Sequence, residues 1–546
     1  MKAFDYIIIG AGAAGCVVAN RLSADPSVSV CLIEAGGDSA SPLVSIPAGI
    51  FGLYGNKTYD YSFQGVPQQH LNNRVMNINR GKGLGGSTAI NSMVYIRGNK
   101  NDYDGWAAEG CEGWSYDDVL PVFKQLEGNK NGQSAQYHGF DGQLHVTQPQ
   151  DAHQIDSTFV KAGVSIGLPK NTDFNGDSQF GLGVYDVKQN NGQRVSSYTA
   201  FVKPVLDRKN LTILTNTEIL SLMITDDTVT GVNAEVNGVG EQIKANREVI
   251  LSAGAIASPR VLLASGIGAK EQLDELGIEC KLDLAGVGEN LQDHIDSMVT
   301  VRAKKSATIG VSLASFVPHV MLAPLKYLFG RKGWLTTNYV EAGGFAKTAL
   351  AEAAPEGSAD ADADVQFHFT PLYRSHRGKK FEFGHGYSVF TCVLRPRSAG
   401  TVKLANDGSL RNVLIDHNFF ADERDQKLLV EGVKKAREIL ASSEFDSMRG
   451  EEMAPGKNVQ SDADILAYLR DSATTVYHPV GTCKMGVDEM AVVDPATLKV
   501  RGMQNLRVMD ASVMPKLISG NTSAPSMMIG QRGAQMILDD LRAAKS

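Results

Sequence analysis

Residues 4–35 read FDYIIIGAGAAGCVVANRLSADPSVSVCLIEA, and this stretch decides the fold. The apolar, β-branched run at 6–9 predicts a short buried strand, residues 16–23 have helical character, and residues 28–33 predict a second strand. Strand, helix and strand in this order form a βαβ unit, which predicts a parallel sheet covered by helices.

Three glycines, Gly10, Gly12 and Gly15, lie between the first strand and the helix, and Glu34 follows the second strand about 20 residues further on. Gly10 permits a tight turn, Gly12 lets the backbone approach a pyrophosphate at the helix N-terminus, and Gly15 lets helix and strand pack closely. Glu34 can accept hydrogen bonds from an adenosine ribose. A glycine-rich turn without function is the alternative, but strand, helix and acid in register predict a dinucleotide site.

A second segment, RGKGLGGSTAIN at 80–91, repeats the glycine spacing at Gly81, Gly83 and Gly86. Residues 75–80 before it are largely polar and do not predict a buried strand, so we do not expect a second nucleotide site here. A loop so dense in glycine lets the backbone come close to a flat ligand, which suits a flavin ring.

Segments far apart in the sequence are expected to share the sheet. Residues 248–252 and 506–509 also predict parallel core strands, which makes the cofactor domain discontinuous. We assign 1–154, 206–299 and 461–546 to this doubly wound α/β domain, and 155–205 and 300–460 to a substrate domain. In the latter, 400–404 and 413–416 predict strands and 425–440 predicts a helix.

Size and composition narrow the class of protein. A chain of 546 residues is too long for one ordinary core, and 43% hydrophobic with 21% charged residues is typical of a soluble globular protein. The net charge of -7 argues against nucleic acid as a partner. The six cysteines are scattered without metal-ligand spacing, so we expect reduced thiols in a cytoplasmic protein and no metal site.

Membrane contact is left open by one apolar stretch. The N-terminal apolar run is too short for a signal peptide or a membrane span. Residues 311–330 are the most apolar, but Pro318, His319, Pro324 and Lys326 argue against a spanning helix. This stretch could lie on the inner membrane or cover an active site, and the Ala- and Asp-rich residues 351–364 predict a surface loop.

Several further motifs carry a family resemblance along the whole chain. They are RGKGLGGSTAINSMVYIRG (80–98), GAIASPRVLLASGIG (254–268), GVGENLQDH (286–294), HPVGTCKMG (478–486), VMDASVMP (508–515) and GNTSAP (520–525). With the N-terminal GAGAAG and Glu34, the sequence is similar to the glucose-methanol-choline (GMC) oxidoreductases.

The resemblance implies one FAD per chain and a second domain whose antiparallel sheet roofs the flavin. Some relatives attach FAD through a His at the position of Ile90, so here the FAD is expected to be held without a covalent bond. Ile219 is expected to meet the adenine through its backbone. The residues expected around the cofactor are Gly10, Gly12, Ala13, Ala14, Gly15, Glu34, Ala35, Arg80, Gly81, Gly85, Gly86, Ser87, Asn91, Ser92, Met93, Val94, Ile219, Asp510, Ala511, Asn521 and Thr522.

Two catalytic residues follow from the resemblance. Oxidising an alcohol needs a base near its oxygen and a rigidly held hydride acceptor near its carbon. Position alone selects none of the eleven histidines, and the family places its base at His478. Asn521 takes the partner position, where an amide can donate to the developing alkoxide, and capping the helix expected from 523 to 541 is its alternative role.

Two further residues are expected to contact the substrate. Glu341 could face the substrate cavity, and a surface or structural carboxylate is the alternative. His368 lies in the alternating run 365–369, where one strand face could roof the pocket.

The expected reaction is oxidation of a primary alcohol, aliphatic or aromatic, with electrons passed to a quinone or another carrier. Details such as NYVEAGGF (338–345) and QFHFTPLY (366–373) are similar to the flavin-dependent alcohol dehydrogenases of this family. Choline dehydrogenase, an oxidase that makes H2O2, and a lyase that holds FAD only as structure remain alternatives. The oligomeric state is not predicted.

Overall fold

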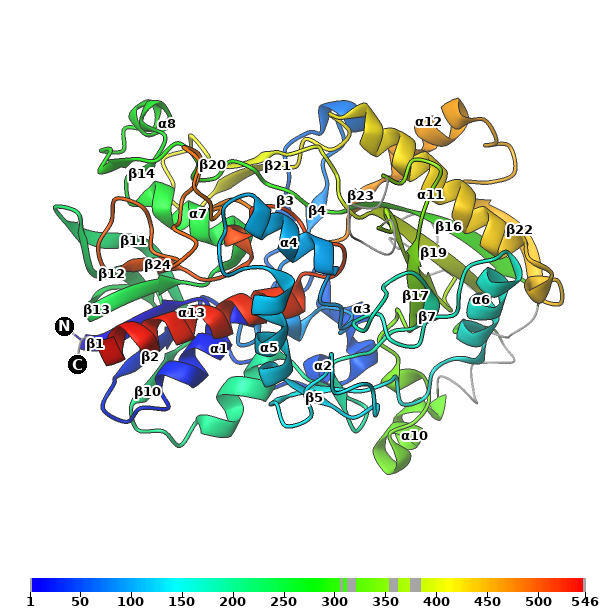
Figure 1. Cartoon of the computed structure of the whole chain (residues 1–546), viewed down its shortest axis with the longest axis horizontal. Helices are drawn as coiled ribbons and strands as arrows, with labels where there is room; N and C mark the ends of the chain where they lie inside the picture. The colour runs from blue at the N-terminus through cyan, green and yellow to red at the C-terminus, as the bar shows by residue number, and fades with distance from the viewer. Residues whose placement is uncertain are drawn as a thin grey trace.

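The computed structural model describes residues 2–304, 308–310, 312, 321–352, 362–373 and 384–543. Figure 1 shows two sheets at opposite ends of the molecule, joined by long connecting segments.

The first sheet is the parallel core that the N-terminal stretch predicts. β10 (Leu211–Leu214), β2 (Val30–Ile33), β1 (Lys2–Ile9) and β13 (Val239–Leu251) are neighbours in this order and run parallel. β24 (Leu506–Val508) pairs in parallel with the end of β13, so strands from both ends of the chain share the sheet. The first half of β13 pairs with an antiparallel extension, β12 (Thr228–Val236) and β11 (Thr217–Thr225).

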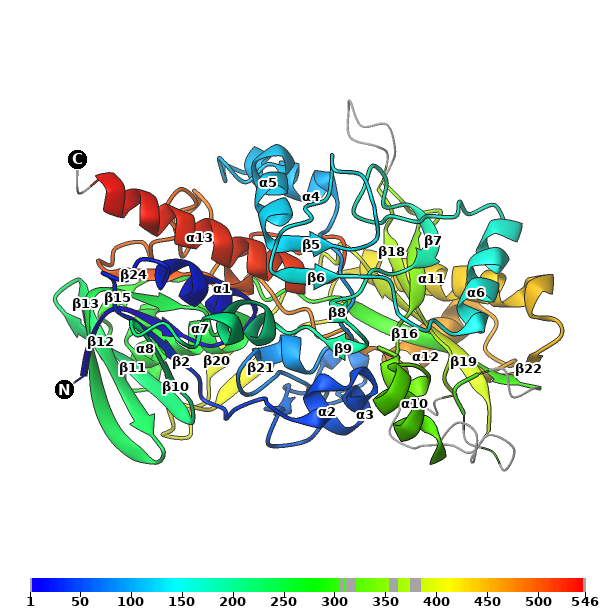
Figure 2. The ribbon, with the colours of Figure 1, turned by 90° about the horizontal axis from the view of Figure 1, so that it is seen from below.

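Two helices lie side by side against this sheet, α1 (Ala13–Leu22) and α13 (Ser523–Ala543), as Figures 1 and 2 both show. A Cβ at Gly530 of α13 would lie 2.7 Å from the carbonyl oxygen of Ala14 in α1. The two helices therefore touch backbone to backbone, which brings the C-terminal segment to the first glycine loop.

The second sheet is antiparallel throughout, which confirms the predicted fold class. Its order is β22 (Arg449–Ala454), β16 (Ile295–Ala303), β19 (Gly386–Val393), β18 (Val365–Thr370), β17 (Ala342–Ala346) and β7 (Gly181–Val184), with β23 (Thr474–Thr475) beside β16. α6 (Gln154–Ser165), α11 (Glu423–Ala441) and α12 (Asp462–Ser472) cover one face and share its apolar core. Phe367 and Phe369 point into that core, so His368 between them points to the opposite face.

The sheets do not follow the predicted domain ranges at every point, and the ranges stay a prediction. β16 begins at Ile295, before the predicted range 300–460, and β23 begins at Thr474, after it. Both strands nevertheless belong to the second sheet. Phe201 and Val202 lie in the core of the first sheet, although 155–205 was assigned to the second domain. β20 (Thr401–Leu404) and β21 (Val413–Asp416) pack against α7 (Gly254–Ala264). Long-range packing decides these memberships, and local patterns do not encode it.

The other described elements lie between or beside the two sheets. They are α2 (Pro42–Ser45), α3 (Ile50–Leu53), β3 (Phe63–Gln64), β4 (Asn77–Ile78), α4 (Lys100–Ala108), α5 (Tyr116–Leu126), β5 (Glu127–Asn129), β6 (Leu144–Val146), β8 (Gln189–Asn190), β9 (Gln193–Arg194), β14 (Ile267–Gly268), α8 (Lys270–Glu275), β15 (Leu282–Asp283) and α10 (Ala323–Gly330), with short 3-10 turns and one π-helical turn (Tyr198–Val202) between them.

Two sequence expectations lie partly outside the described residues, namely 311 and 313–320 of the apolar stretch and 353–361 of the predicted surface loop. Among the helices of the described ranges, none combines the length and apolar character that crossing a bilayer requires.

Candidate active site

The first glycine loop, at Gly10, Gly12 and Gly15, forms a cradle of bare backbone. There is no room for a side chain at Gly10 or Gly15, and there is open space beside Gly12. A Cβ at Gly10, whose φ is +100°, would lie 2.5 Å from the carbonyl oxygen of Ser252, and one at Gly15 would lie 1.9 Å from that of Gly10. A Cβ at Gly12 would lie 3.9 Å from the nearest protein atom beyond its chain neighbours, the carbonyl oxygen of Ser252, and Gly12 is the N-cap of α1 without a side-chain cap. The open space and the free N–H groups of the first turn, at Ala13 and Ala14, fit a pyrophosphate.

Glu34 does more than the sequence predicts, because its buried carboxylate also ties the two glycine loops together. Its Oε2 accepts the N–H of Ala11 at 3.0 Å, and its Oε1 accepts the N–H groups of Gly36 and Gly83, both at 2.9 Å. Burial raises the pKa of Glu34, and these three N–H donors oppose the rise. A carboxylate has about four acceptor sites, so one remains for a ribose hydroxyl. Ala35 follows, half-buried.

The second glycine loop lies directly against the first. A Cβ at Gly86 would be 2.9 Å from the Cα of Gly12, and the N–H of Gly85 donates to the carbonyl oxygen of Ala11 at 2.8 Å. The N–H of Gly81 donates to Ser87 Oγ at 3.1 Å, which closes the loop on itself. The close approach requires glycine, as the sequence analysis expects of a loop that meets a flat ligand.

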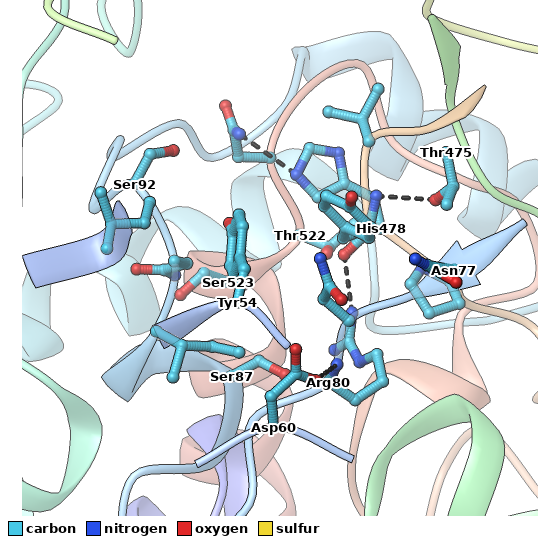
Figure 3. A pocket seen from close by; sticks show the side chains of 18 of the residues that line it. Tyr54, Asp60, Asn77, Arg80, Ser87, Ser92, Thr475, His478, Thr522 and Ser523 are labelled. Carbon is cyan, nitrogen blue, oxygen red and sulfur yellow. Dashed lines mark hydrogen bonds between the residues drawn. The ribbon is translucent and has the colours of Figure 1, made fainter. Parts of the chain in front are cut away.

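A cavity of about 870 Å³ opens where this loop meets the inner face of the second sheet, and Figure 3 shows His478 in it with Arg80 and Asp60. Its volume is within the range of ligand pockets and suits a flavin ring with a small substrate. The predicted residues on its wall are Ala13, Arg80, Ser87, Asn91, Ser92, Met93, Val94, His368, His478, Ala511, Asn521 and Thr522.

Two residues predicted to bind the cofactor, Ile219 and Asp510, do not line the cavity, and both accept hydrogen bonds from other residues of the protein. The carbonyl oxygen of Ile219 accepts a hydrogen bond from Arg260 Nη1 at 2.8 Å. Asp510 Oδ2 accepts from the N–H of Gly254 at 2.8 Å, and its Oδ1 accepts from the N–H of Ser512 at 2.8 Å. Asp510 therefore joins the start of α7 to the turn that carries Ala511 to the cavity.

The expectation that Glu341 faces the substrate cavity is wrong for this structure. Tyr339 and Val340 line the cavity, but Glu341, the next residue, is not on its wall. Glu341 is 1% exposed, and its Oε2 accepts the N–H of His153 at 2.8 Å at the start of α6. Burial and this carboxylate raise the pKa of the neighbouring Asp156. Glu341 thus stabilises a helix N-terminus.

His478 is held between two polar side chains in the interior. Its Nδ1 lies 2.9 Å from His294 Nδ1, and its Nε2 lies 3.2 Å from Asn521 Nδ2. On the far side, His294 Nε2 lies 3.0 Å from the carbonyl oxygen of Leu394 and 3.1 Å from that of Ile518. Because carbonyl oxygens only accept, His294 carries its proton on Nε2.

The proton positions in the rest of the cluster follow from this one. Burial lowers the pKa of His294 to about 4, so the ring is neutral at pH 7 and its Nδ1 is an acceptor. His478 must then donate from Nδ1, which leaves a lone pair on its Nε2. Asn521 Oδ1 accepts from Gln366 Nε2 at 3.3 Å, so the amide NH2 of Asn521 faces that lone pair. The cluster can therefore accept a proton at His478 Nε2.

Burial also keeps His478 neutral. Desolvation, then the nearby His294, His368, Arg80 and Lys188, lower the pKa of His478 well below its usual 6.5. The sequence predicts a value near neutrality, and the structure differs chiefly because the ring is buried. His368, on β18, is also buried, and burial lowers its pKa to about 4.

Sequence reasoning assigned no role to Asp293 and His294, although both lie in the motif GVGENLQDH. Asp293 Oδ1 accepts the backbone N–H of His478 at 2.8 Å, while His294 fixes the ring. Tyr477, the residue before His478, has a φ of +67°, and its carbonyl oxygen accepts a hydrogen bond from Arg80 Nη1 at 2.7 Å. The adjacent acid and imidazole in that motif, Asp293 and His294, were the sequence signal that could have indicated a role at the site.

A glycine cradle for a dinucleotide beside a buried neutral imidazole defines the class of protein, an oxidoreductase that uses a dinucleotide cofactor. Comparison with known proteins gives the family. The N-terminal and C-terminal models of the GMC oxidoreductases match residues 4–296 and 396–530, so the chain belongs to the GMC oxidoreductase family.

Individual relatives agree over nearly the whole chain. An alcohol dehydrogenase [acceptor] of Pseudomonas putida is 43% identical over 537 residues, covering 98% of this chain and 96% of the relative. An oxygen-dependent choline dehydrogenase of Staphylococcus xylosus is 38% identical over 546 residues, covering 98% and 95%. The formate oxidase of Aspergillus oryzae, solved in a study of its FAD modification, superposes with a TM-score of 0.90 at 25% identity, covering 99% of each chain. The protein is an FAD-dependent oxidoreductase that acts on alcohols.

Proposed function

We propose that this enzyme oxidises a primary alcohol, aliphatic or aromatic, to the aldehyde, with His478 as the base that takes the hydroxyl proton. The observation that carries the proposal is the hydrogen-bond chain from His294 through His478 to Asn521, which leaves Nε2 as the unprotonated nitrogen of His478, beside Asn521 on the wall of the cavity.

The side chains divide the work. His478 Nε2 accepts the proton, and the NH2 group of Asn521, which has a second N–H, donates to the oxygen as negative charge develops on it. His294 accepts from His478 Nδ1–H and keeps the ring in the required tautomer. FAD, when bound, supplies the hydride acceptor. Ile90, where covalent attachment would need a nucleophile, is an apolar buried side chain, which supports non-covalent binding.

The choice of substrate rests on the relatives and on the cavity wall. The higher identity to the alcohol dehydrogenase favours an uncharged alcohol, and the aromatic rings of Phe51, Tyr339 and Phe390 on the wall suit an aliphatic or aromatic chain. Choline is the second candidate, because the same rings and the carboxylate of Asp296 on that wall could hold a quaternary ammonium.

A substrate panel tests the proposal. The holoenzyme is mixed under nitrogen with a series of primary alkanols, benzyl alcohol and choline, and bleaching of the flavin absorbance is followed by stopped flow. Faster bleaching by choline than by any uncharged alcohol would replace the proposal with the second candidate. Absence of bleaching with every alcohol would leave the lyase alternative. Peroxide released in air at the rate of turnover would identify an oxidase in place of a dehydrogenase.

We also propose that electrons leave to a quinone or another carrier at a membrane surface. Leu325, Leu328 and Phe329 of α10 are exposed, Phe329 to 88%, which is unusual for large apolar side chains. Sedimentation with liposomes of the enzyme's host lipids, compared with a Leu328→Ser/Phe329→Ser double variant, checks this contact. Equal sedimentation of the two proteins would contradict it.

A further inference from the structure

One buried cation beside the cavity takes no part in the proton chain. Lys188 lies immediately before β8 and is 0% exposed. Its Nζ donates to the carbonyl oxygen of Val94 at 3.1 Å and to Ser523 Oγ at 3.1 Å. Both Val94 and Ser523 line the cavity, and Ser523, labelled in Figure 3, begins α13.

The surroundings of this ammonium offer hydrogen bonds but no opposite charge. No ion pair that the described residues form includes Lys188, and the charged or titratable groups that act on it or respond to it are Arg194 and His478. Burial, and then Arg194, lower the pKa of Lys188 to about 7. An ammonium without a counter-charge is costly to bury, so its place beside the cavity points to a function.

Arg194 does not duplicate Lys188. Its Nε donates to the carbonyl oxygen of Val44, and its Nη1 donates to backbone oxygens of the loop that lines the cavity. Arg194 therefore positions that loop, whereas Lys188 places its charge between the end of the loop and the N-terminus of α13. The positive end of that helix adds to the same field.

The reaction itself creates the missing negative charge. In the proposed function, on which this inference rests, the alcohol carbon loses a hydrogen with both electrons to the flavin, and the hydroxyl proton goes to His478. The flavin ring thereby gains one negative charge and the imidazole one positive charge. We propose that Lys188 is the buried counter-charge that stabilises the flavin ring once it carries this negative charge, and so sets the reduction potential of the bound FAD.

Three substitutions separate charge from hydrogen bonding. Lys188→Gln keeps a donor for Val94 and removes the charge, Lys188→Met removes both, and Lys188→Arg keeps both. Lys270→Met, at an exposed site on α8, is the control for loss of one positive charge elsewhere on the surface.

Sulfite is the probe, because it adds to an oxidised flavin without any alcohol. Its sulfur lone pair forms an N–S bond to the ring, which then carries the added negative charge. Holoenzymes are titrated with sulfite, and the midpoint potentials are measured by dye equilibration. Lys188→Gln and Lys188→Met should each weaken sulfite binding about tenfold or more and lower the potential, by about 30 mV for each factor of ten in a two-electron couple. Lys188→Arg and Lys270→Met should stay within about threefold of the unaltered protein on this scale.

The outcomes are distinct. Unchanged sulfite affinity and potential in both neutral variants would overturn the proposal and leave Lys188 a structural donor to Val94. Loss of FAD from both neutral variants would overturn it in favour of a role in cofactor binding. Because neither readout uses an alcohol, a failure of the proposed substrate or base would appear in the bleaching assay and leave these two measurements unaffected.

Discussion

The glycine cradle reaches the cavity through Ala13 and the imidazole cluster reaches it through His478, but the two are built in opposite ways. The cradle, at Gly10, Gly12 and Gly15, is made of backbone and of the absence of side chains. The cluster, at His294 and His478, is made of side-chain nitrogens whose proton positions depend on their neighbours. We therefore expect substitutions in the cradle to act by steric exclusion, nearly all or none, and substitutions in the cluster to act in graded steps through electrostatics.

The largest effect is expected from a pair of substitutions within the cradle. Gly15→Ala places a Cβ 1.9 Å from a carbonyl oxygen and should cost about 3 kcal/mol of folding stability as well as FAD binding. Gly12→Ala meets no close protein atom, so the protein should fold normally and lose FAD alone. Thermal unfolding and flavin absorbance of the purified variants measure both effects. Gly12→Ala protein that binds FAD normally would contradict the placement of the pyrophosphate.

The next effect is expected at the base. His478→Ala should slow flavin reduction by the alcohol about 10³-fold, the usual contribution of a general base, while FAD stays bound. His70→Ala, a histidine away from the cavity, is the control. Anaerobic stopped flow measures the rate, and bleaching at the original speed would exclude His478 as the base.

The pH dependence of the unaltered protein follows from the same residue. Because burial lowers the pKa of His478 below 6.5, the folded protein binds fewer protons there than the unfolded chain. The stability that this ring contributes is therefore present above pH 6.5 and lost as pH falls below it, and activity needs the unprotonated ring. The acid limb of kcat/KM should lie below pH 6.5, and an acid limb above it would contradict the buried, neutral state.

A smaller effect is expected at His294. His294→Leu removes the acceptor of His478 Nδ1–H, so the tautomer is no longer fixed, and flavin reduction should slow about 10- to 100-fold, less than when the base itself is lost. His294 also lowers the pKa of His478, so the acid limb should move to higher pH in the variant. The pH profile separates this effect from a general structural loss, and a slower enzyme with an unmoved acid limb would argue against the tautomer role.

The smallest effect is expected at Glu341. Glu341→Gln removes a negative charge from the N-terminus of α6 and should cost about 0.5–1 kcal/mol of stability. Substrate kinetics should change less than twofold, because the side chain points away from the cavity. Urea unfolding measures the first and steady-state kinetics the second. A tenfold rise in KM would return Glu341 to the cavity.

The parallel sheet and the flavin-side loops could be predicted because each is encoded by neighbouring residues. The period of apolar residues predicts β1, α1, β2, β21 and α11 to within a few residues, and the glycine spacing predicts the turn between β1 and α1. The second sheet was less accessible, since β16 and β23 pair across long stretches of chain. The direction of Glu341 and the roles of Asp293 and His294 depend on such pairings.

The sequence by itself predicted the dinucleotide cradle and carried the family motifs, because both depend on residue types at short, fixed spacings, and the resemblance to that family supplied the candidate base. Only the tertiary structure decided which nitrogen of His478 has the free lone pair, how far burial lowers its pKa, and that Lys188 lies without a counter-charge at the start of α13. Proton positions and desolvation depend on atoms brought together from distant segments, and no local pattern in the chain records them.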